Sequence, residues 1–225
     1  MTAPRLDVRE VDRDRWPDLV RLFGGRGGPK SCWCMVWRAT PQEAKQTDGA
    51  SRKRALQARV RNGVPIGLLG YADGEPVAWC SIAPRETYRR LAHVPAKACP
   101  RPDRGWTPVR RQEHARLNES RACPDSKGTG QALGGPDDHD AVGVWSLACF
   151  FIRRDLRRQG IAAQLIEAAV AHARARGATV VEAYPVDPDS PSYRFMGFVD
   201  TFCRAGFREV GRAGKRRNVM RLDLR

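Results

Sequence analysis

The residues best placed to do chemistry stand in the short sequence R-R-Q-G-I-A, at 157–162. Before it, 142–152 is an apolar run without clean alternation, which predicts a strand covered on both faces. After it, apolar residues recur at spacings of three and four, which predicts an amphipathic helix that ends near Gly177. A small-residue turn at a helix N-terminus leaves several backbone N–H groups unpaired, here beside two guanidinium groups. We therefore predict an anion cradle that suits a pyrophosphate.

Shorter patterns on either side predict the elements that must position this unit. Alternation of apolar and polar residues, β-branched runs and turn residues predict strands at 6–11, 66–72, 76–83, 178–184, 208–212 and 218–224. Amphipathic spacing and stop signals predict helices at 12–23, 51–62 and 195–205. The turn A-D-G-E between the second and third of these strands is a strong hairpin signal.

The length of 225 residues fits a single domain that spans 1–225. From about 95 to 140 the pattern gives way to Pro, Gly, Arg, Asp and Ser. We interpret this stretch as a long irregular insertion, and the sequence does not indicate its role.

The chain is strongly basic, with 40 Lys and Arg against 25 Asp and Glu and a formal net charge of +15. This excess of positive charge speeds association with anions. It does not indicate whether the anion is a nucleotide-bearing cofactor, a nucleic acid or an acidic substrate. No nucleic-acid-binding signature is found, so nucleic acid is the less favoured partner. No apolar run approaches the ~20 residues that span a bilayer. Since the N-terminus also lacks a signal-peptide pattern, we expect a cytoplasmic protein with no membrane partner.

The segment S-C-W-C-M-V-W-R, at 31–38, is unusually dense in Trp, Cys and Met. Two interpretations are open. The favoured one is that this segment packs as a hydrophobic plug over the core, and the other is that its exposed face lines a substrate pocket. On the second interpretation, the substrate groove lies between this segment and the predicted hairpin, with Cys32, Trp33, Trp37 and Trp79 as substrate-binding candidates. No matching Cys or His pair follows Cys32 and Cys34 at zinc-finger distance, so no metal is expected.

The order of these elements resembles the GNAT-type N-acetyltransferases. Their signature is Gln or Arg, two residues, Gly, one residue, then Gly or Ala, and it is matched by Arg157, Gly160 and Ala162. A Gly-Phe pair before two closing strands is matched by Gly206 and Phe207. The resemblance covers most of the chain outside the insertion. It implies an α/β (α+β) fold in which helices flank a mixed, mostly antiparallel central sheet.

The resemblance also implies acetyl-coenzyme A as cosubstrate and an acyltransferase activity. Backbone groups at the end of the central strand would pair with the pantetheine, and the turn amides would hold the pyrophosphate. The cofactor-binding residues would then be Phe150, Phe151, Ile152, Arg157, Arg158, Gln159, Gly160, Ile161, Ala162 and Ala163. The expected reaction transfers an acetyl group to a primary amine of a small molecule or a protein, by direct attack in a ternary complex.

The chain departs from the family where proton transfer is concerned. The central strand carries no carboxylate to serve as base, and Phe202 stands where many members have a general-acid Tyr. Cys149, Glu182 and Tyr184 are the catalytic candidates, against the simpler interpretations of a small buried thiol, a solvent-facing carboxylate and a packed ring. The alternative function is a catalytically degenerate acyl-coenzyme A-binding regulatory protein. The sequence leaves open the acceptor amine and whether the chain forms a homodimer.

Overall fold

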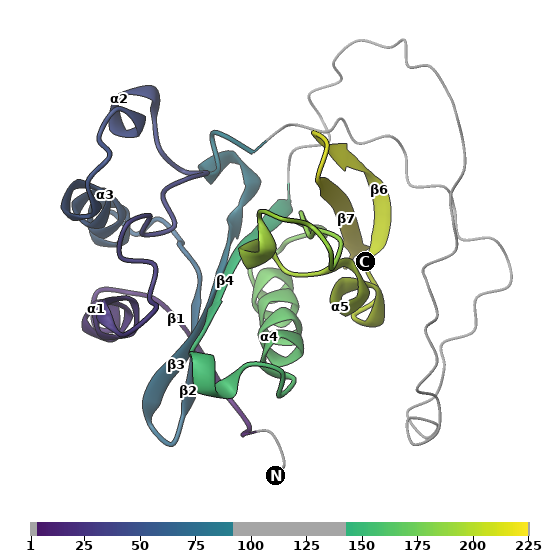
Figure 1. Cartoon of the computed structure of the whole chain (residues 1–225), viewed down its shortest axis with the longest axis horizontal. Coiled ribbons are helices and arrows are strands. Elements are labelled where there is room, and N and C mark those ends of the chain that lie inside the picture. Colours follow the sequence, from purple (N-terminus) through teal and green to yellow (C-terminus); the bar gives the residue numbers. More distant parts are fainter. Residues whose placement is uncertain (1–3, 92–142, 225) are drawn as a thin grey trace, which may run out of the picture.

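The computed structural model describes residues 4–91 and 143–224, and the expected insertion at 95–140 lies outside them. The described residues form a seven-stranded sheet in the order β1-β2-β3-β4-β5-β7-β6 (Figure 1). The β4–β5 pair is parallel and the other neighbouring pairs are antiparallel, which confirms the predicted mixed sheet. The strands are β1 Asp7–Glu10, β2 Leu68–Ala72, β3 Glu75–Pro84, β4 Val144–Ile152, β5 Val180–Ala183, β6 Arg208–Ala213 and β7 Arg217–Asp223.

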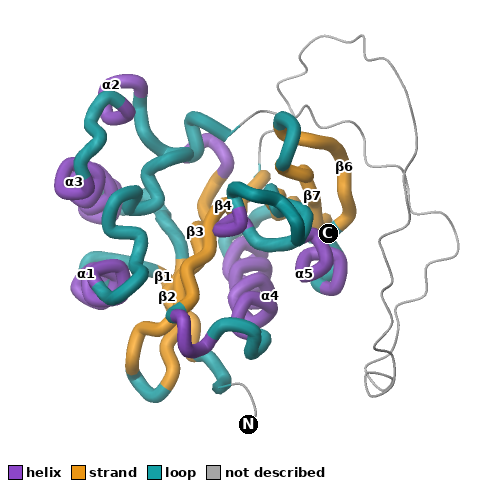
Figure 2. Tube along the Cα trace, viewed as in Figure 1, coloured by secondary structure: helices purple, strands orange, loops and turns teal. Residues whose placement is uncertain are grey.

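Helices lie on both sides of this sheet (Figure 2). The α-helices are α1 Trp16–Gly24, α2 Pro41–Ala44, α3 Gly49–Arg61, α4 Ile161–Ala175 and α5 Val199–Arg204. Short 3-10 helices are η1 Arg85–Thr87, η3 Arg154–Leu156 and η4 Arg194–Met196. The predicted strands and most of the predicted helices are thus present, with shifts of a few residues at their ends.

The helix predicted at 195–205 is wrong at its first half. Gly197 has φ +87° and ψ 179°, a conformation outside the helical region, so it separates η4 from α5. The turn between β2 and β3 is as expected, because Asp73 and Gly74 both have positive φ, which a two-residue hairpin of type I′ requires.

The two faces of the sheet carry different helices. Along β3, Cys80 and Ile82 belong to the apolar cluster under α4, whereas Trp79 belongs to the cluster under α1 and α3. Helix α4 buries the stripe that its spacing predicted, and each fully buried Leu or Ile contributes about 1.5–3 kcal/mol of transfer free energy. This stripe consists of Ile161, Leu165, Ile166, Ala169 and Ala173.

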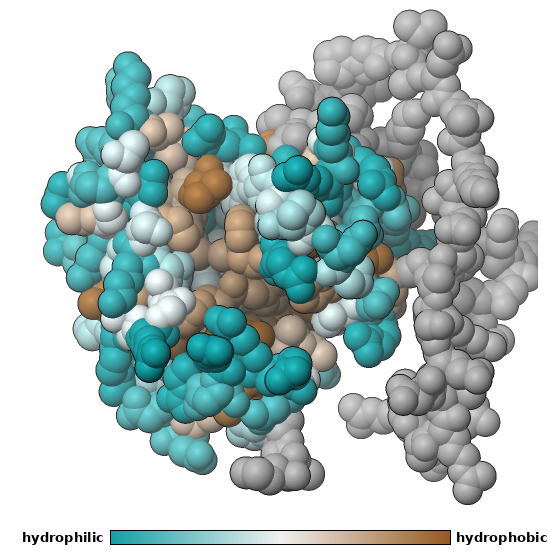
Figure 3. Space-filling view, in the orientation of Figure 1, coloured by the Kyte–Doolittle hydropathy of each residue, from teal (hydrophilic) through white to brown (hydrophobic). Residues whose placement is uncertain are grey.

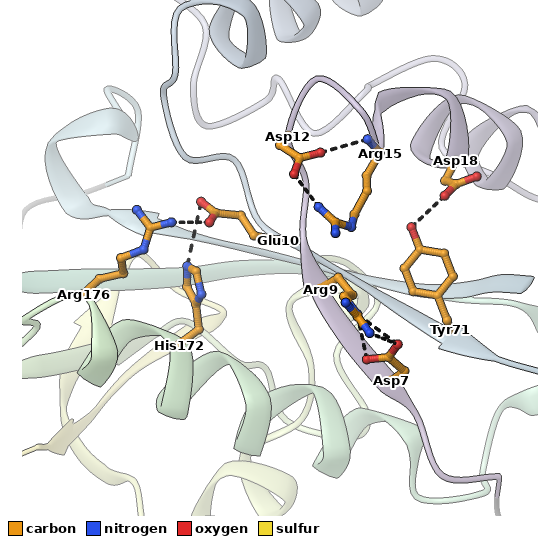
Figure 4. Close-up of polar contacts among 9 residues, drawn as sticks. All are labelled: Asp7, Arg9, Glu10, Asp12, Arg15, Asp18, Tyr71, His172 and Arg176. Carbon is orange, nitrogen blue, oxygen red and sulfur yellow. Dashed lines mark hydrogen bonds and ion pairs between the residues drawn. The ribbon is translucent and has the colours of Figure 1, made fainter. Parts of the chain in front are cut away.

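Polar contacts attach the edge strand β1 and its neighbour β2 to helices on opposite faces (Figure 4). Glu10 on β1 forms an ion pair with Arg176 at the end of α4 and lies 4.0 Å from His172 Nε2. The hydroxyl of Tyr71 on β2 donates to an Asp18 carboxylate oxygen on α1 at 2.8 Å. The sheet and its helices are therefore joined at this edge by charge as well as by apolar packing.

Candidate active site

Strands β4 and β5 run side by side only over their first halves. They pair from Val144 and Val180 to Leu147 and Ala183. Beyond that point β4 continues to Ile152, paired with β3 alone among the described residues. The register with β3 also shifts between Ser81 and Ile82, so that Ala148 is the extra residue of a β-bulge. The second half of β4 therefore has a free edge facing the gap where β5 diverges.

Backbone groups on this free edge follow from the register. Arg153 N–H donates to Val77 O on β3 at 2.9 Å. Since successive residues of a strand alternate, the backbone of Phe151 also faces β3, whereas the N–H and C=O of Phe150 and Ile152 face the gap. The Ile152 carbonyl accepts a hydrogen bond from Arg157 Nε at 3.0 Å. Phe150 and Ile152 are thus the two predicted residues whose backbone could pair with an added strand-like ligand.

The turn after β4 forms the expected cradle. Arg158 and Gly160 both have left-handed φ, of 63° and 77°, and α4 begins at the next residue. Ala163 N–H donates to Gly160 O at 3.0 Å, but the N–H groups of 158–162 donate to no other group within the described part of the chain. Apart from its own chain neighbours, no described residue has an atom within 4 Å of where a Gly160 Cβ would stand. Open space, free N–H groups and the positive end of a helix dipole suit a phosphate group.

Aromatic side chains cover the α4 side of the gap. Phe202 on α5 is fully buried, with its ring 6.1 Å from that of Phe150 and 5.1 Å from that of Phe207. Figure 3 shows an apolar hollow near the middle of the face in view, where Figure 1 places β4. The position where the resemblance implies a general-acid Tyr is therefore occupied here by a packed, apolar ring.

Two catalytic candidates meet in a buried polar network on the opposite face. Tyr184 OH donates to Glu182 Oε1 at 2.5 Å and lies 3.1 Å from Ser146 Oγ. Glu182 Oε2 accepts from Arg221 Nε at 2.6 Å and lies 3.5 Å from Arg85 Nη1. Glu182 is fully buried, so the interpretation of a solvent-facing carboxylate is wrong.

The electrostatics of this network favour a structural role for Tyr184 and Glu182. Burial, followed by the nearby Glu182 charge, raises the pKa of Tyr184 well above 10. A hydroxyl that holds its proton so firmly is a weak acid at neutral pH. Its bond to Ser146 also directs it back over the paired part of β4 and β5. A catalytic role for Glu182 and Tyr184 stays a prediction.

The middle of the segment at 31–38 packs as the favoured hydrophobic plug, with Trp33, Cys34 and Met35 buried. Trp33 and Trp79 are 5% and 0% exposed, and both rings contact Phe23 of α1. Trp79 Nε1 donates to Cys34 Sγ at 3.2 Å, so side chains fill the groove expected between this segment and the hairpin. The structure therefore places Trp33 and Trp79 in the core and not at an open surface.

The other candidates in this region have different surroundings. Cys149 of β4 is 8% exposed, and its sulfur lies 3.5 Å from that of Cys34. Cys32 is partly exposed, and burial raises the pKa of its thiol. No His, Cys, Asp or Glu side chains of residues 4–91 and 143–224 are grouped as a metal site requires.

Trp37 belongs to the same segment but packs against a different cluster from Trp33 and Cys34, close to the gap. Its ring centroid is 6.0 Å from that of Tyr193, and the Arg217 guanidinium stacks 4.6 Å above it. Trp37 Nε1 and Arg217 Nη1 have no hydrogen-bond partner among the described residues. Trp37 and Tyr193 pack against the cluster that holds Ala148 and Tyr184, where β4 and β5 diverge. Sequence patterns gave no signal for Arg217, because only the fold brings the start of β7 to this place.

Comparison with known proteins gives a consistent result. Residues 96–198 match the model of the acetyltransferase (GNAT) family. A solved acetyltransferase structure is 16% identical with a TM-score of 0.50, covering 97% of this chain and 100% of its own. The GNAT domain of PAT from S. lividans is 14% identical with a TM-score of 0.50, covering 97% of this chain and 90% of its own.

At these identities the two solved structures establish a shared fold, which confirms the fold implied by the resemblance. No curated protein matches the chain. Among the described residues, no helix is both long and apolar enough to cross a membrane.

Proposed function

We propose that this chain is a GNAT-type acetyltransferase that transfers an acetyl group from acetyl-coenzyme A to a primary amine, and the family model matched by residues 96–198 and the shared fold support this. The observation that carries the proposal is the adjacency of two features. The free edge of β4 ends at Ile152, and the cradle of unpaired N–H groups begins six residues later at Arg158. Acetyl-coenzyme A needs both, one for its pantetheine amides and one for its pyrophosphate.

The chain's own residues suit these tasks. Phe150 and Ile152 offer backbone donors and acceptors to the pantetheine in the manner of an added strand. The N–H groups of 158–162 receive the pyrophosphate, with the guanidinium groups of Arg157 and Arg158 beside them. Gly160 keeps this space clear, since a side chain would project into it.

The acceptor amine approaches, on this proposal, from the face opposite α4. Trp37 and Tyr193 border the divergence of β4 and β5 on that face, so Trp37 is the predicted substrate residue that keeps this role. The amine nitrogen attacks the thioester carbonyl directly, and N–H groups of the free edge stabilise the oxyanion. A thiol of pKa ~8.5 leaves readily as a thiolate, so a side-chain acid at Phe202 is not required.

Calorimetric titration with acetyl-coenzyme A tests the site. We expect micromolar binding to the wild type and at least about a hundredfold loss for Gly160→Glu, which puts bulk and negative charge where the pyrophosphate belongs. Gly177→Glu is a matched control at the other end of α4, because Gly177 also has positive φ, of 81°, and open space around its missing Cβ. It should bind as the wild type does. Equal losses for both variants would overturn the assignment of the cradle.

A second candidate function is a catalytically degenerate acyl-coenzyme A-binding regulatory protein. The apolar Phe202 and the ion-paired Glu182 favour it, because neither supplies a ready acid or base. The two candidates agree on acetyl-coenzyme A binding and differ on turnover. Thiol release from acetyl-coenzyme A, measured against a panel of small amines and peptide N-termini, separates them. Release that requires an amine supports the enzyme, and binding without release supports the regulator.

A further inference from the structure

Two thiols face each other between the plug segment and the central strand. Cys34 and Cys149 are 115 residues apart in sequence, yet their sulfur atoms are 3.5 Å apart. Cys34 is 6% exposed and Cys149 is 8% exposed, so both residues are buried close to the surface limit of the core. Cys149 lies on β4 directly after the bulge residue Ala148, at the start of the free edge.

The backbone that presents Cys34 is strained. Trp33 and Cys34 have consecutive left-handed φ values of 45° and 51°. Residues other than glycine, asparagine and aspartate rarely adopt this region, and a bulky side chain such as Trp is disfavoured there. Strain of this kind persists where the surroundings impose it, and it concentrates at functional sites. Cys34 lies in this strained stretch, and its sulfur is 3.5 Å from that of Cys149.

The surroundings stabilise a negative charge on Cys34. Trp79 Nε1 donates to Cys34 Sγ at 3.2 Å. The Arg38 guanidinium is fully buried nearby, and its described hydrogen bonds go to uncharged oxygens, among them Ile66 O at 2.8 Å and Tyr88 OH at 2.6 Å. The hydrogen bond with Cys149 is the largest cause that lowers the pKa of Cys34. Burial opposes it, whereas the Trp79 hydrogen bond and the Arg38 charge lower the pKa further.

Another buried thiol shows the contrast. Cys80 lies on the α4 side of the sheet, where no described side chain donates a hydrogen bond to it, and burial raises its pKa to about 12. Burial alone thus makes a thiol inert, whereas the donors around Cys34 favour the reactive thiolate.

We propose that Cys34 and Cys149 form a redox-sensitive site that a small peroxide converts to a disulfide. The Cys34 thiolate attacks one peroxide oxygen, the O–O bond breaks, and Cys34 sulfenic acid and hydroxide form. The Cys149 thiol then attacks the sulfenic sulfur, an S–S bond forms, and the hydroxyl leaves with the Cys149 proton as water. The sulfurs need to close from 3.5 Å to about 2.05 Å, a small movement.

The disulfide would bind the plug segment covalently to β4 at the start of its free edge. Because this chemistry uses neither acetyl-coenzyme A nor an amine, the inference stands apart from the proposed transferase function.

Peptide mapping of the folded wild-type protein tests the site. The protein is treated with hydrogen peroxide, alkylated, digested with trypsin without reduction, and analysed by mass spectrometry. We expect a peptide containing Cys149 linked to the peptide at 31–38, its loss on treatment with dithiothreitol, and alkylated Cys80. Absence of this link after treatment that oxidises other thiols would overturn the proposal. So would a link that forms only in urea.

Two variants assign the link within the segment at 31–38, which holds two cysteines. Cys32→Ala should keep the linked peptide, because Cys32 does not contact Cys149. Cys34→Ala should abolish it. A link that survives Cys34→Ala and disappears in Cys32→Ala would overturn the assignment. If Cys34→Ala fails to fold, the Cys32→Ala map still decides, since Cys34 is then the only cysteine left in that peptide.

Discussion

Glu182 is a catalytic candidate in the sequence, but in the fold its side chain forms buried ion pairs and hydrogen bonds. Its carboxylate is fully buried and contacts the Arg85 guanidinium on η1, the Arg221 guanidinium on β7 and the Tyr184 phenol just after β5. Val181 and Ala183 face α4, so the alternation of β5 places Glu182 on the other face. No pattern in the sequence distinguished that buried face from a solvent-exposed one.

Removing this charge should destabilise the protein strongly. Glu182→Gln takes away the carboxylate that the Arg221 and Arg85 guanidinium groups contact, and breaking a buried ion pair costs about 3–5 kcal/mol. The measurement is the free energy of unfolding in urea. Glu209→Gln is the control, because Glu209 pairs with Arg212 at 3.8 Å on the surface and should cost less than about 1 kcal/mol. Equal costs for both variants would contradict the structural role of Glu182.

Phe202 gives a second prediction at this scale. Phe202→Tyr restores the hydroxyl that many GNAT enzymes carry, but the thiolate leaving group makes a side-chain acid unnecessary on the proposed route. We therefore expect kcat to change by less than about threefold, whereas supplying a missing general acid would raise it about 10²-fold or more. Steady-state thiol release measures the effect. A large rise would show that proton delivery limits the wild-type enzyme.

At the scale of elements, sequence patterns identified the long periodic ones and missed those that depend on a few residues. Helix α4 and the strands β2, β3 and β4 appear where their apolar spacing predicted them. Helix α2 was missed because four residues carry no periodicity, although Thr40 and Glu43 form a capping box that its sequence T-P-Q-E encodes. The free edge of β4 could be expected only through the resemblance, since where β5 diverges is decided by pairing across the chain.

The capping box of α2 predicts a pH dependence. Arg59 is the largest cause that lowers the pKa of Glu43 to about 2, and it also ties α2 to α3. A carboxyl whose folded pKa is depressed stabilises the fold above its unfolded pKa of 4.5. That contribution fades as the pH falls from about 4.5 toward about 2. The urea midpoint of Glu43→Gln should therefore lie below that of the wild type at pH ~7, by a gap that narrows at pH ~3. A constant gap would contradict the assigned ion pair.

At the scale of the whole molecule, charge should govern how quickly the anionic cosubstrate arrives. With a net charge of +15, the chain attracts acetyl-coenzyme A over distances that salt screens. We expect the association rate constant, measured by stopped flow, to fall by roughly tenfold between ~50 mM and ~500 mM salt, with a smaller change in the dissociation rate. An association rate constant that does not change with salt would mean that the excess positive charge lies away from the approach to the site.

The arrangement of the sheet has a mechanical consequence. Four antiparallel strands, β1 to β4, and three more, β5, β7 and β6, are joined by four residue pairs between β4 and β5. This short seam is where two halves of the sheet would part first under thermal fluctuation, and it lies next to the gap proposed for the cosubstrate. A molecule that binds along β4 and reaches toward β5 would therefore also hold the two halves of the sheet together. Catalysis and cohesion of the two halves would then depend on the same few strand residues, and saturation with ligand would protect the seam amides from hydrogen exchange.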